Sequence, residues 1–179
     1  MPEQDAEHIQ RVARAIDDFI TLDLACLGVA RCLFDALQQH QAGPMCLAGA
    51  EFLRRHLPEE DGLVCIATGF PMGGGVPETD GPVGAAMLAR ALHQAFGAHC
   101  VLVTYQGWEE SLKAACIGAG LSPMALPEQG VERIHYLRPA YIAAVPREQQ
   151  ACEQTCKRLL ELAPNLLIAI ERPGKNHLG

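Results

Sequence analysis

The segment spanning residues 64–85 constrains the fold of this 179-residue chain more strongly than any other part. It begins with an apolar run over residues 64–67, and a short run of this kind between turn residues is typical of a buried strand in a parallel sheet. It ends in an Ala- and Leu-rich stretch that predicts a helix, with Pro82 near the first helical position. A strand, a polar loop and a helix in this order are the building unit of an α/β sheet.

Strand-like and helix-like segments continue to alternate along the rest of the chain. Such alternation predicts parallel strands joined by right-handed crossovers. We therefore expect an α/β fold, a three-layer Rossmann-like domain with a mostly parallel sheet. The predicted segments are strands 63–68, 100–104 and 166–170, weaker strands 124–126 and 133–137, and helices 82–96, 108–117 and 146–162.

The first sixty residues have a helical pattern. Apolar residues between Ile9 and Ile20 repeat at steps of three and four, which predicts one amphipathic helix. Two further helices are predicted, over residues 25–39 and 45–56. We interpret residues 1–179 as a single domain, with the helical residues 1–60 packed on it as extra N-terminal helices.

Composition narrows the classes of partner. The net charge of −7 argues against a nucleic-acid partner. The longest apolar runs are far shorter than the roughly 20 residues that span a bilayer, and the first residues show no secretory signal pattern. We expect a cytoplasmic protein with no membrane partner, and the sequence leaves a homo-oligomer open.

The chain has eight cysteines, yet no Cys-x-x-Cys pair occurs. Cys152 and Cys156 lie four residues apart on one predicted helix face, without further metal ligands nearby in the sequence. We expect reduced, mostly buried thiols that pack as small apolar groups.

Polar residues follow two of the predicted strands. The loop after the first strand carries Glu78, Thr79 and Asp80, and the last strand is followed by Glu171 and Arg172. Because parallel strands end at the same edge of a sheet, the two loops are expected to meet over one crevice. The free N–H groups of the helix that starts beyond Gly81 would favour an anion there.

Each of these residues has a functional and a structural interpretation. Glu78 and Asp80 form either an acid–base pair or a divalent-cation site; alternatively, Asp80 caps the helix and Glu78 lies in solvent. Arg172 either binds a substrate carboxylate or forms a surface ion pair. The glycine run 73–75 is either a ligand-binding loop or simply a mobile one.

Three elements carry a family resemblance: Thr68-Gly69-Phe70-Pro71, the segment Pro77-Glu78-Thr79-Asp80-Gly81-Pro82-Val83-Gly84-Ala85, and Glu171-Arg172-Pro173-Gly174. Together they resemble the D-glutamate cyclase C-terminal domain family, in its stand-alone bacterial form. The resemblance implies a carbon–oxygen lyase that dehydrates D-glutamate to 5-oxo-D-proline, with a small amino-acid or carboxylate substrate and no cofactor. Fitted to that reaction as a hypothesis, the candidate catalytic residues are Glu78, Asp80 and Glu171, and the candidate substrate-binding residues are Thr68, Gly69, Thr79, Gly81, Gly84 and Arg172.

Two other functions are compatible with the same residues. One is a binding module that holds a carboxylate or phosphate without turnover. The other is an Mg²⁺-dependent enzyme for a phosphorylated or nucleotide substrate, with Glu78, Asp80 and Glu171 around the ion. Sensitivity to a chelator distinguishes the Mg²⁺ enzyme from the cyclase, and chiral product analysis distinguishes the cyclase from the binding module.

Overall fold

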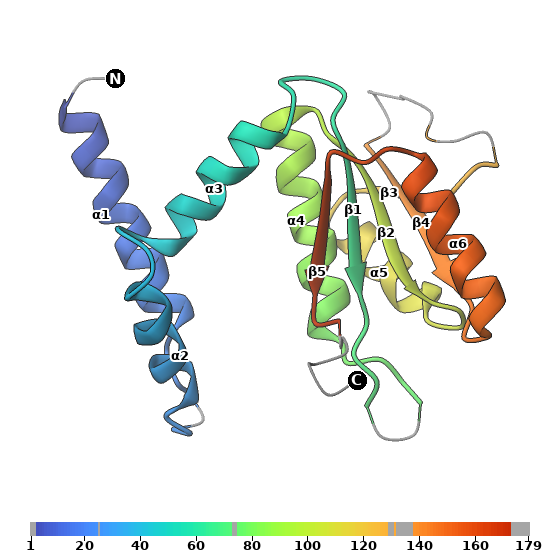
Figure 1. The fold of residues 1–179 in the computed structure, drawn as a ribbon, viewed down its shortest axis with the longest axis horizontal. Coiled ribbons are helices and arrows are strands. Elements are labelled where there is room, and N and C mark those ends of the chain that lie inside the picture. Colours follow the sequence, from blue (N-terminus) through green and yellow to red (C-terminus); the bar gives the residue numbers. More distant parts are fainter. Residues whose placement is uncertain (1–2, 25, 73–74, 129–130, 132–137, 173–179) are drawn as a thin grey trace. The chain divides into compact units, whose positions relative to one another are not determined.

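The computed structural model describes residues 3–24, 26–72, 75–128, 131 and 138–172. The chain forms two compact units, Met1–His56 and Leu57–Gly179 (Figure 1). The first is made of helices and the second is built around a sheet. That the helices pack on the sheet unit stays a prediction.

The helical unit contains α1 (Glu3–Ile20), α2 (Val29–Gln38) and α3 (Met45–His56). The predicted bounds of α3 are confirmed, whereas the prediction that the second helix begins near residue 25 is wrong. Gly28, immediately before α2, has a left-handed backbone with φ 72°, and its N–H donates to the carboxylate of Asp23. A left-handed residue cannot continue a right-handed helix, so α2 begins only at Val29.

One carboxylate joins α1 to α3 in the helical unit. Asp17 is buried on α1, and its two oxygens accept hydrogen bonds from the N–H groups of Met45, at 2.6 Å, and Cys46, at 3.0 Å. The Cys46 thiol donates to the carbonyl of Ala13 at 3.2 Å. Asp17 thus satisfies two free N–H groups in the first turn of α3 and places a negative charge near its positive end.

The sheet unit has five strands in the spatial order β3-β4-β2-β1-β5, and every neighbouring pair is parallel. The predicted α/β fold with a largely parallel sheet is confirmed. The strands are β1 (Leu63–Thr68), β2 (His99–Tyr105), β3 (Ser122–Ala125), β4 (Pro139–Val145) and β5 (Leu166–Ile170).

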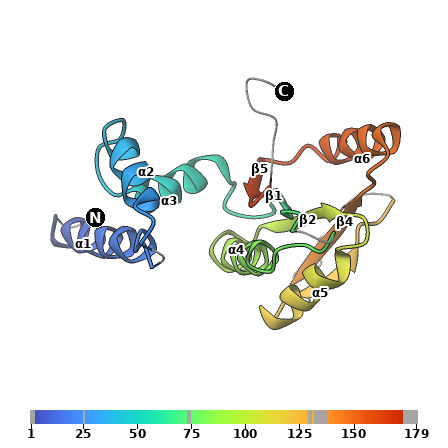
Figure 2. The same cartoon turned by 90° about the horizontal axis from the view of Figure 1, so that it is seen from below.

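Helices cover both faces of this sheet. The helices of the sheet unit are α4 (Asp80–Phe96), α5 (Glu109–Gly118) and α6 (Gln149–Glu161). Figure 2 shows α4 and α5 on one face and α6 on the other, which gives the three layers expected from the sequence. On the α4 side, Ala85, Ala86 and Ala89 are almost completely buried. Their small side chains let the helix approach the strands closely.

Strand β4 was missing from the sequence prediction. Its seven residues are buried almost throughout, and it pairs with both β2 and β3. The adjoining helix was predicted from residue 146 but begins at Gln149, because the Glu148 carboxylate caps it by accepting from the N–H groups of Gln150 and Ala151. The weak strand predicted over residues 133–137 lies outside the described residues.

All eight cysteines are free thiols. Cys65, Cys100 and Cys116 are buried in the sheet unit, and burial raises the pKa of Cys100 to about 12. Cys26, Cys32 and Cys156 are exposed. The expectation of mostly buried thiols is therefore wrong for the cysteines of the helical unit. Within the described residues, no helix is both long and apolar enough to span a bilayer.

Candidate functional site

The loop from β1 to α4 folds back on itself and returns Glu78 to the end of the strand. Pro71 and Pro77 form an antiparallel bridge, and the N–H of Glu78 donates to the carbonyl of Phe70 at 2.9 Å. A further bond joins the N–H of Met72 to the carbonyl of Val76. The ten-residue separation between Thr68 and Glu78 is thereby closed by backbone hydrogen bonds.

A tryptophan fixes this loop to the neighbouring strand end. Trp108 is 6% exposed, and its indole N–H donates to the carbonyl of Gly75 at 3.0 Å. At the base of the loop, Gly69 has φ 124°, and a Cβ there would lie only 3.1 Å from the Trp108 ring. Glycine is required at this position both by the backbone conformation and by the packing. Gly73 and Gly74 lie outside the described residues.

The acidic side chain at the start of α4 belongs to the first helical residue. Thr79 occupies the N-cap position without a side-chain cap bond, and α4 begins at Asp80, two residues earlier than predicted. Asp80 accepts from the N–H of its neighbour Gly81 at 3.0 Å. Asp80 is therefore not the N-cap residue, although its carboxylate does satisfy one N–H of the first turn, and Pro82 is the third residue of the helix. A carboxylate in the first turn is stabilised by the positive end of the helix.

Glu171 leaves β5 in a strained conformation. Its φ of 46° is left-handed, which costs a non-glycine residue roughly 1–2 kcal/mol. This turn carries its carboxylate to the start of α4, where Oε2 lies 3.2 Å from the position that a Cβ on Gly81 would occupy. Strain of this kind persists where the surrounding structure enforces it, and it is frequent at functional sites.

The structure brings Glu78, Asp80 and Glu171 together. One carboxylate oxygen from each lies within 4.8 Å of those from the other two, with Glu78 half-buried and the other two exposed. The pKa of Glu171 is raised by a hydrogen bond with Asp80, by partial loss of hydration and by the neighbouring negative charges. We call these three residues the acidic cluster. Their proximity was expected from the sequence, whereas their catalytic roles stay a prediction.

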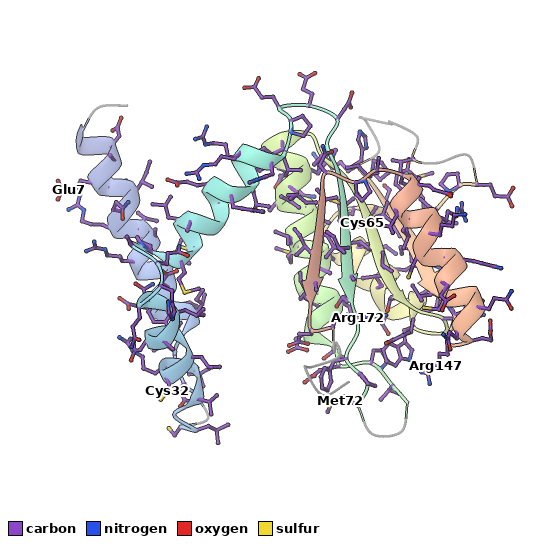
Figure 3. The ribbon with its side chains drawn as sticks, viewed as in Figure 1. Glu7, Cys32, Cys65, Met72, Arg147 and Arg172 are labelled. Carbon is purple, nitrogen blue, oxygen red and sulfur yellow. The ribbon has the colours of Figure 1, made fainter. Side chains whose placement is uncertain are left out.

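Arg172 follows Glu171 in the chain and lies at the carboxyl ends of the strands (Figure 3). Its Nη1 donates to the carbonyl of Thr68 at 3.5 Å, and its guanidinium carbon is 3.7 Å from the centre of the Tyr105 ring. Among the described residues it forms no ion pair, so the surface ion pair considered for Arg172 is not observed there. A half-buried guanidinium held on an aromatic face retains donors for an anionic ligand.

Sequence reasoning missed a second arginine at this edge. Arg147 follows β4, and its guanidinium carbon lies 5.6 Å from the Trp108 ring centre and 6.0 Å from that of Tyr105 (Figure 3). The apolar run over residues 140–145, followed by Pro146, was the available signal for the strand. Recognising that strand would have placed Arg147 at the same edge as Arg172.

The remaining predicted ligand-binding positions differ in what surrounds them. Thr68 is fully buried at the end of β1, and its hydroxyl has no hydrogen-bond partner among the described residues. A Cβ on Gly81 would lie 2.7 Å from that hydroxyl. Gly84 faces β5, where its nearest neighbour is the Cγ2 of Ile170. The residues that follow Arg172 lie outside the described part of the chain.

This arrangement combines an acidic cluster, an aromatic-backed arginine and a helix N-terminus at one edge of a parallel sheet. Carboxylates bind ammonium groups or metal ions and exchange protons. Guanidinium and free N–H groups bind carboxylates or phosphates. The arrangement therefore offers groups that can bind positive charge and groups that can bind negative charge.

Comparison with curated proteins finds no match. Comparison with solved structures likewise finds none. A family model described as "D-glutamate cyclase-like, C-terminal" matches residues 16–179, nearly the whole chain. The chain belongs to the D-glutamate cyclase-like C-terminal domain family.

Proposed function

We propose that this chain is a carbon–oxygen lyase that converts D-glutamate to 5-oxo-D-proline and water. In the reaction the α-amino nitrogen attacks the γ-carboxyl carbon, a C–N bond forms, and a C–O bond breaks. The ammonium group loses protons, and the departing oxygen gains them as it leaves as water. Family membership supports the reaction class, and the polar groups at the sheet edge support this type of substrate.

The observation that carries the proposal is the meeting of three carboxylates at the sheet edge to which Arg172 also belongs. A glutamate ion carries two carboxylates and one ammonium. Arg172 would hold one carboxylate, and the positive end of the α4 dipole would favour the other. The acidic cluster would hold the ammonium. Fixing both ends of the substrate folds it toward ring closure, which is the proximity contribution to the rate.

Proton transfer falls to the acidic cluster. Glu78 or Asp80 would take a proton from the ammonium, and another carboxyl group of the cluster would protonate the departing oxygen. The atoms involved all lie within 4.8 Å of one another, so one small substrate can reach each of them. Acid–base groups of this kind typically contribute 10²–10⁴-fold to the rate.

The test is a chiral assay of the product. The full chain is incubated with D-glutamate or L-glutamate, and 5-oxoproline is separated by enantiomer. We expect 5-oxo-D-proline from D-glutamate, and a loss of about 10²–10⁴-fold in turnover for Glu78→Gln with the fold intact. Full activity in Glu78→Gln would remove this residue from the mechanism. Absence of product from either enantiomer with the unaltered chain would contradict the proposal.

Glu60→Gln is the matched control for Glu78→Gln. Glu60 is an exposed glutamate that precedes β1, so it is attached to the opposite end of that strand from the loop carrying Glu78. The same loss of one carboxylate charge there should leave turnover unchanged. Equal losses in both variants would indicate a general charge effect rather than a role of the site.

A further inference from the structure

The acidic cluster brings three carboxyl groups together with no cationic side chain paired to them in the part of the chain that the structure describes. Glu78, Asp80 and Glu171 come from a loop, a helix start and a strand end, and their oxygens meet within 4.8 Å. Among the described residues, no lysine or arginine forms an ion pair with any of them. Arg172, which follows Glu171, donates instead to the carbonyl of Thr68 and lies on the Tyr105 ring. Carboxylates at this distance repel one another unless a cation or a proton lies between them.

A second observation at the same place is independent of these charges. The Thr68 side chain is 0% exposed, and its hydroxyl oxygen has no hydrogen-bond partner among the described residues. Buried hydroxyls in proteins are nearly always hydrogen-bonded, so an unpartnered one indicates a ligand atom that completes it. Threonine and serine hydroxyls are established ligands of Mg²⁺.

The Thr68 hydroxyl lies near the Glu171 carboxylate of the acidic cluster. A Cβ built on Gly81 would lie 2.7 Å from this hydroxyl oxygen and 3.2 Å from Oε2 of Glu171, so both oxygens border the same point. Because position 81 is a glycine, no side chain fills the space between them. The hydroxyl and the carboxylate therefore both lie next to Gly81 at the start of α4.

We propose that Glu78, Asp80 and Glu171, with the Thr68 hydroxyl, bind one divalent cation of the Mg²⁺ and Mn²⁺ class. All four donors are hard oxygen atoms, which favour these ions over zinc, for which nitrogen and sulfur ligands are typical. Four protein donors leave part of a six-coordinate shell for water or substrate oxygen. One oxygen of each carboxylate is enough for the ion, so the others stay available for an ammonium group.

The proposal goes beyond the cyclase activity and does not depend on it. Its test is therefore the binding of Mn²⁺ alone to the full chain, measured from the loss of the free-ion signal in electron paramagnetic resonance. We expect one Mn²⁺ per chain, displaced by excess Mg²⁺. Glu171→Gln should weaken binding by at least about tenfold, and Thr68→Val should weaken it as well, within the range typical of lost metal-site contacts.

Glu60→Gln is again the control, and it should bind Mn²⁺ as the unaltered chain does. If Glu171→Gln fails to fold, Asp80→Asn removes another of the three carboxylate charges and takes its place. No stoichiometric Mn²⁺ binding, or equal binding by the cluster variants and Glu60→Gln, would overturn the cation site. A chain that forms 5-oxo-D-proline but binds no Mn²⁺ contradicts only this proposal, and one that binds Mn²⁺ without turnover contradicts only the cyclase activity.

Discussion

The helical unit and the sheet unit bury their apolar side chains to very different extents. In the sheet unit Val64, Ile66, Val101 and Leu102 are completely buried. Among the described residues of the helical unit, the buried ones are Ala13, Asp17 and Pro44. The sheet unit is held by a packed apolar core, whereas the helical unit has few buried residues and one of them is the Asp17 carboxylate.

The well-packed sheet unit is the part of the chain that can hold functional side chains in fixed positions. Catalytic groups need supporting elements that do not move, and the strands around Thr68 and Glu171 belong to the well-packed sheet. The large apolar side chains of the helical unit are mostly exposed, among them Phe19, Leu24 and Leu33. The acidic cluster and both arginines all lie in the sheet unit.

The largest difference is expected between two leucine substitutions. Leu102→Ala removes a fully buried side chain from β2 and should lower the free energy of unfolding by about 2–5 kcal/mol. Leu33→Ala removes a side chain that is 60% exposed and should change the free energy of unfolding by no more than about 0.5 kcal/mol. Urea unfolding of both variants measures the two values. Equal losses would show that the helical unit has a core of its own.

A pair of glycines in α4 distinguishes tight packing from open space. Gly81→Ala places a Cβ 2.7 Å from the buried Thr68 hydroxyl and should destabilise the chain by about 1–3 kcal/mol. Gly84→Ala meets only Ile170 at 3.7 Å and should stabilise the helix by about 0.5–1 kcal/mol. Thermal unfolding should therefore shift in opposite directions, and a shift in the same direction would contradict this packing.

In the helical unit the most sensitive position is expected to be Asp17. Asp17→Asn weakens the bonds to the N–H groups of Met45 and Cys46 and should cost about 0.5–2 kcal/mol, as for the loss of a helix cap. Faster amide hydrogen exchange at these two residues is the expected signature. Unchanged exchange there would show that α3 does not depend on this carboxylate.

The same residue gives the helical unit a pH dependence. Burial raises the pKa of Asp17, but hydrogen bonds from Cys46 and Met45 outweigh it, and the net direction is below the ordinary value of 3.8. Its contribution to stability is therefore complete above pH 3.8 and is lost as the pH falls through the lower, folded-state value. Amide chemical shifts of Met45 during acid titration should report this loss. A midpoint above the ordinary value would contradict the hydrogen-bond account.

The reactivity of the cysteine thiols compares burial in the two units, and it is measured on the unaltered chain. Cys26 and Cys32 in the helical unit are exposed and should react with a thiol reagent in the folded chain. Burial raises the pKa of Cys65 and Cys116 in the sheet unit to about 11, so their thiolate is scarce as well as inaccessible. These two should react only after unfolding. Rapid reaction at Cys116 in the folded chain would show that the core opens.

Much of the sheet could be predicted from sequence because its strands are compact apolar runs. Strands β1 and β5 have the predicted bounds, and both are bounded by turn residues. Strand β4 was missed because three of its seven residues are alanine, which has little preference for strands. Its pairing with β2 and β3 on both sides determines its structure, and this pairing is a tertiary contact that sequence periodicity does not reveal.

The same limit applies to the candidate site. The meeting of Asp80 with Glu171 followed from the rule that parallel strands end at one edge. Glu78 is brought back to the end of β1 by the hydrogen bond from its N–H to the carbonyl of Phe70. The position of Arg172 depends on its contact with the Tyr105 ring. The burial of the unpartnered Thr68 hydroxyl depends on Gly81, which packs against it. Such contacts between distant residues cannot be read from local spacing.

The most direct test of the proposed site is a crystal structure of the full chain with 5-oxo-D-proline. The proposal predicts density for the product between the acidic cluster and Arg172, with its carboxylate within hydrogen-bond distance of the guanidinium. A separate, largely apolar cavity of about 310 Å³ lies between the sheet and α6, and Arg172 also lines it. Density for the product in that cavity, or away from the cluster altogether, would contradict the assignment of the site.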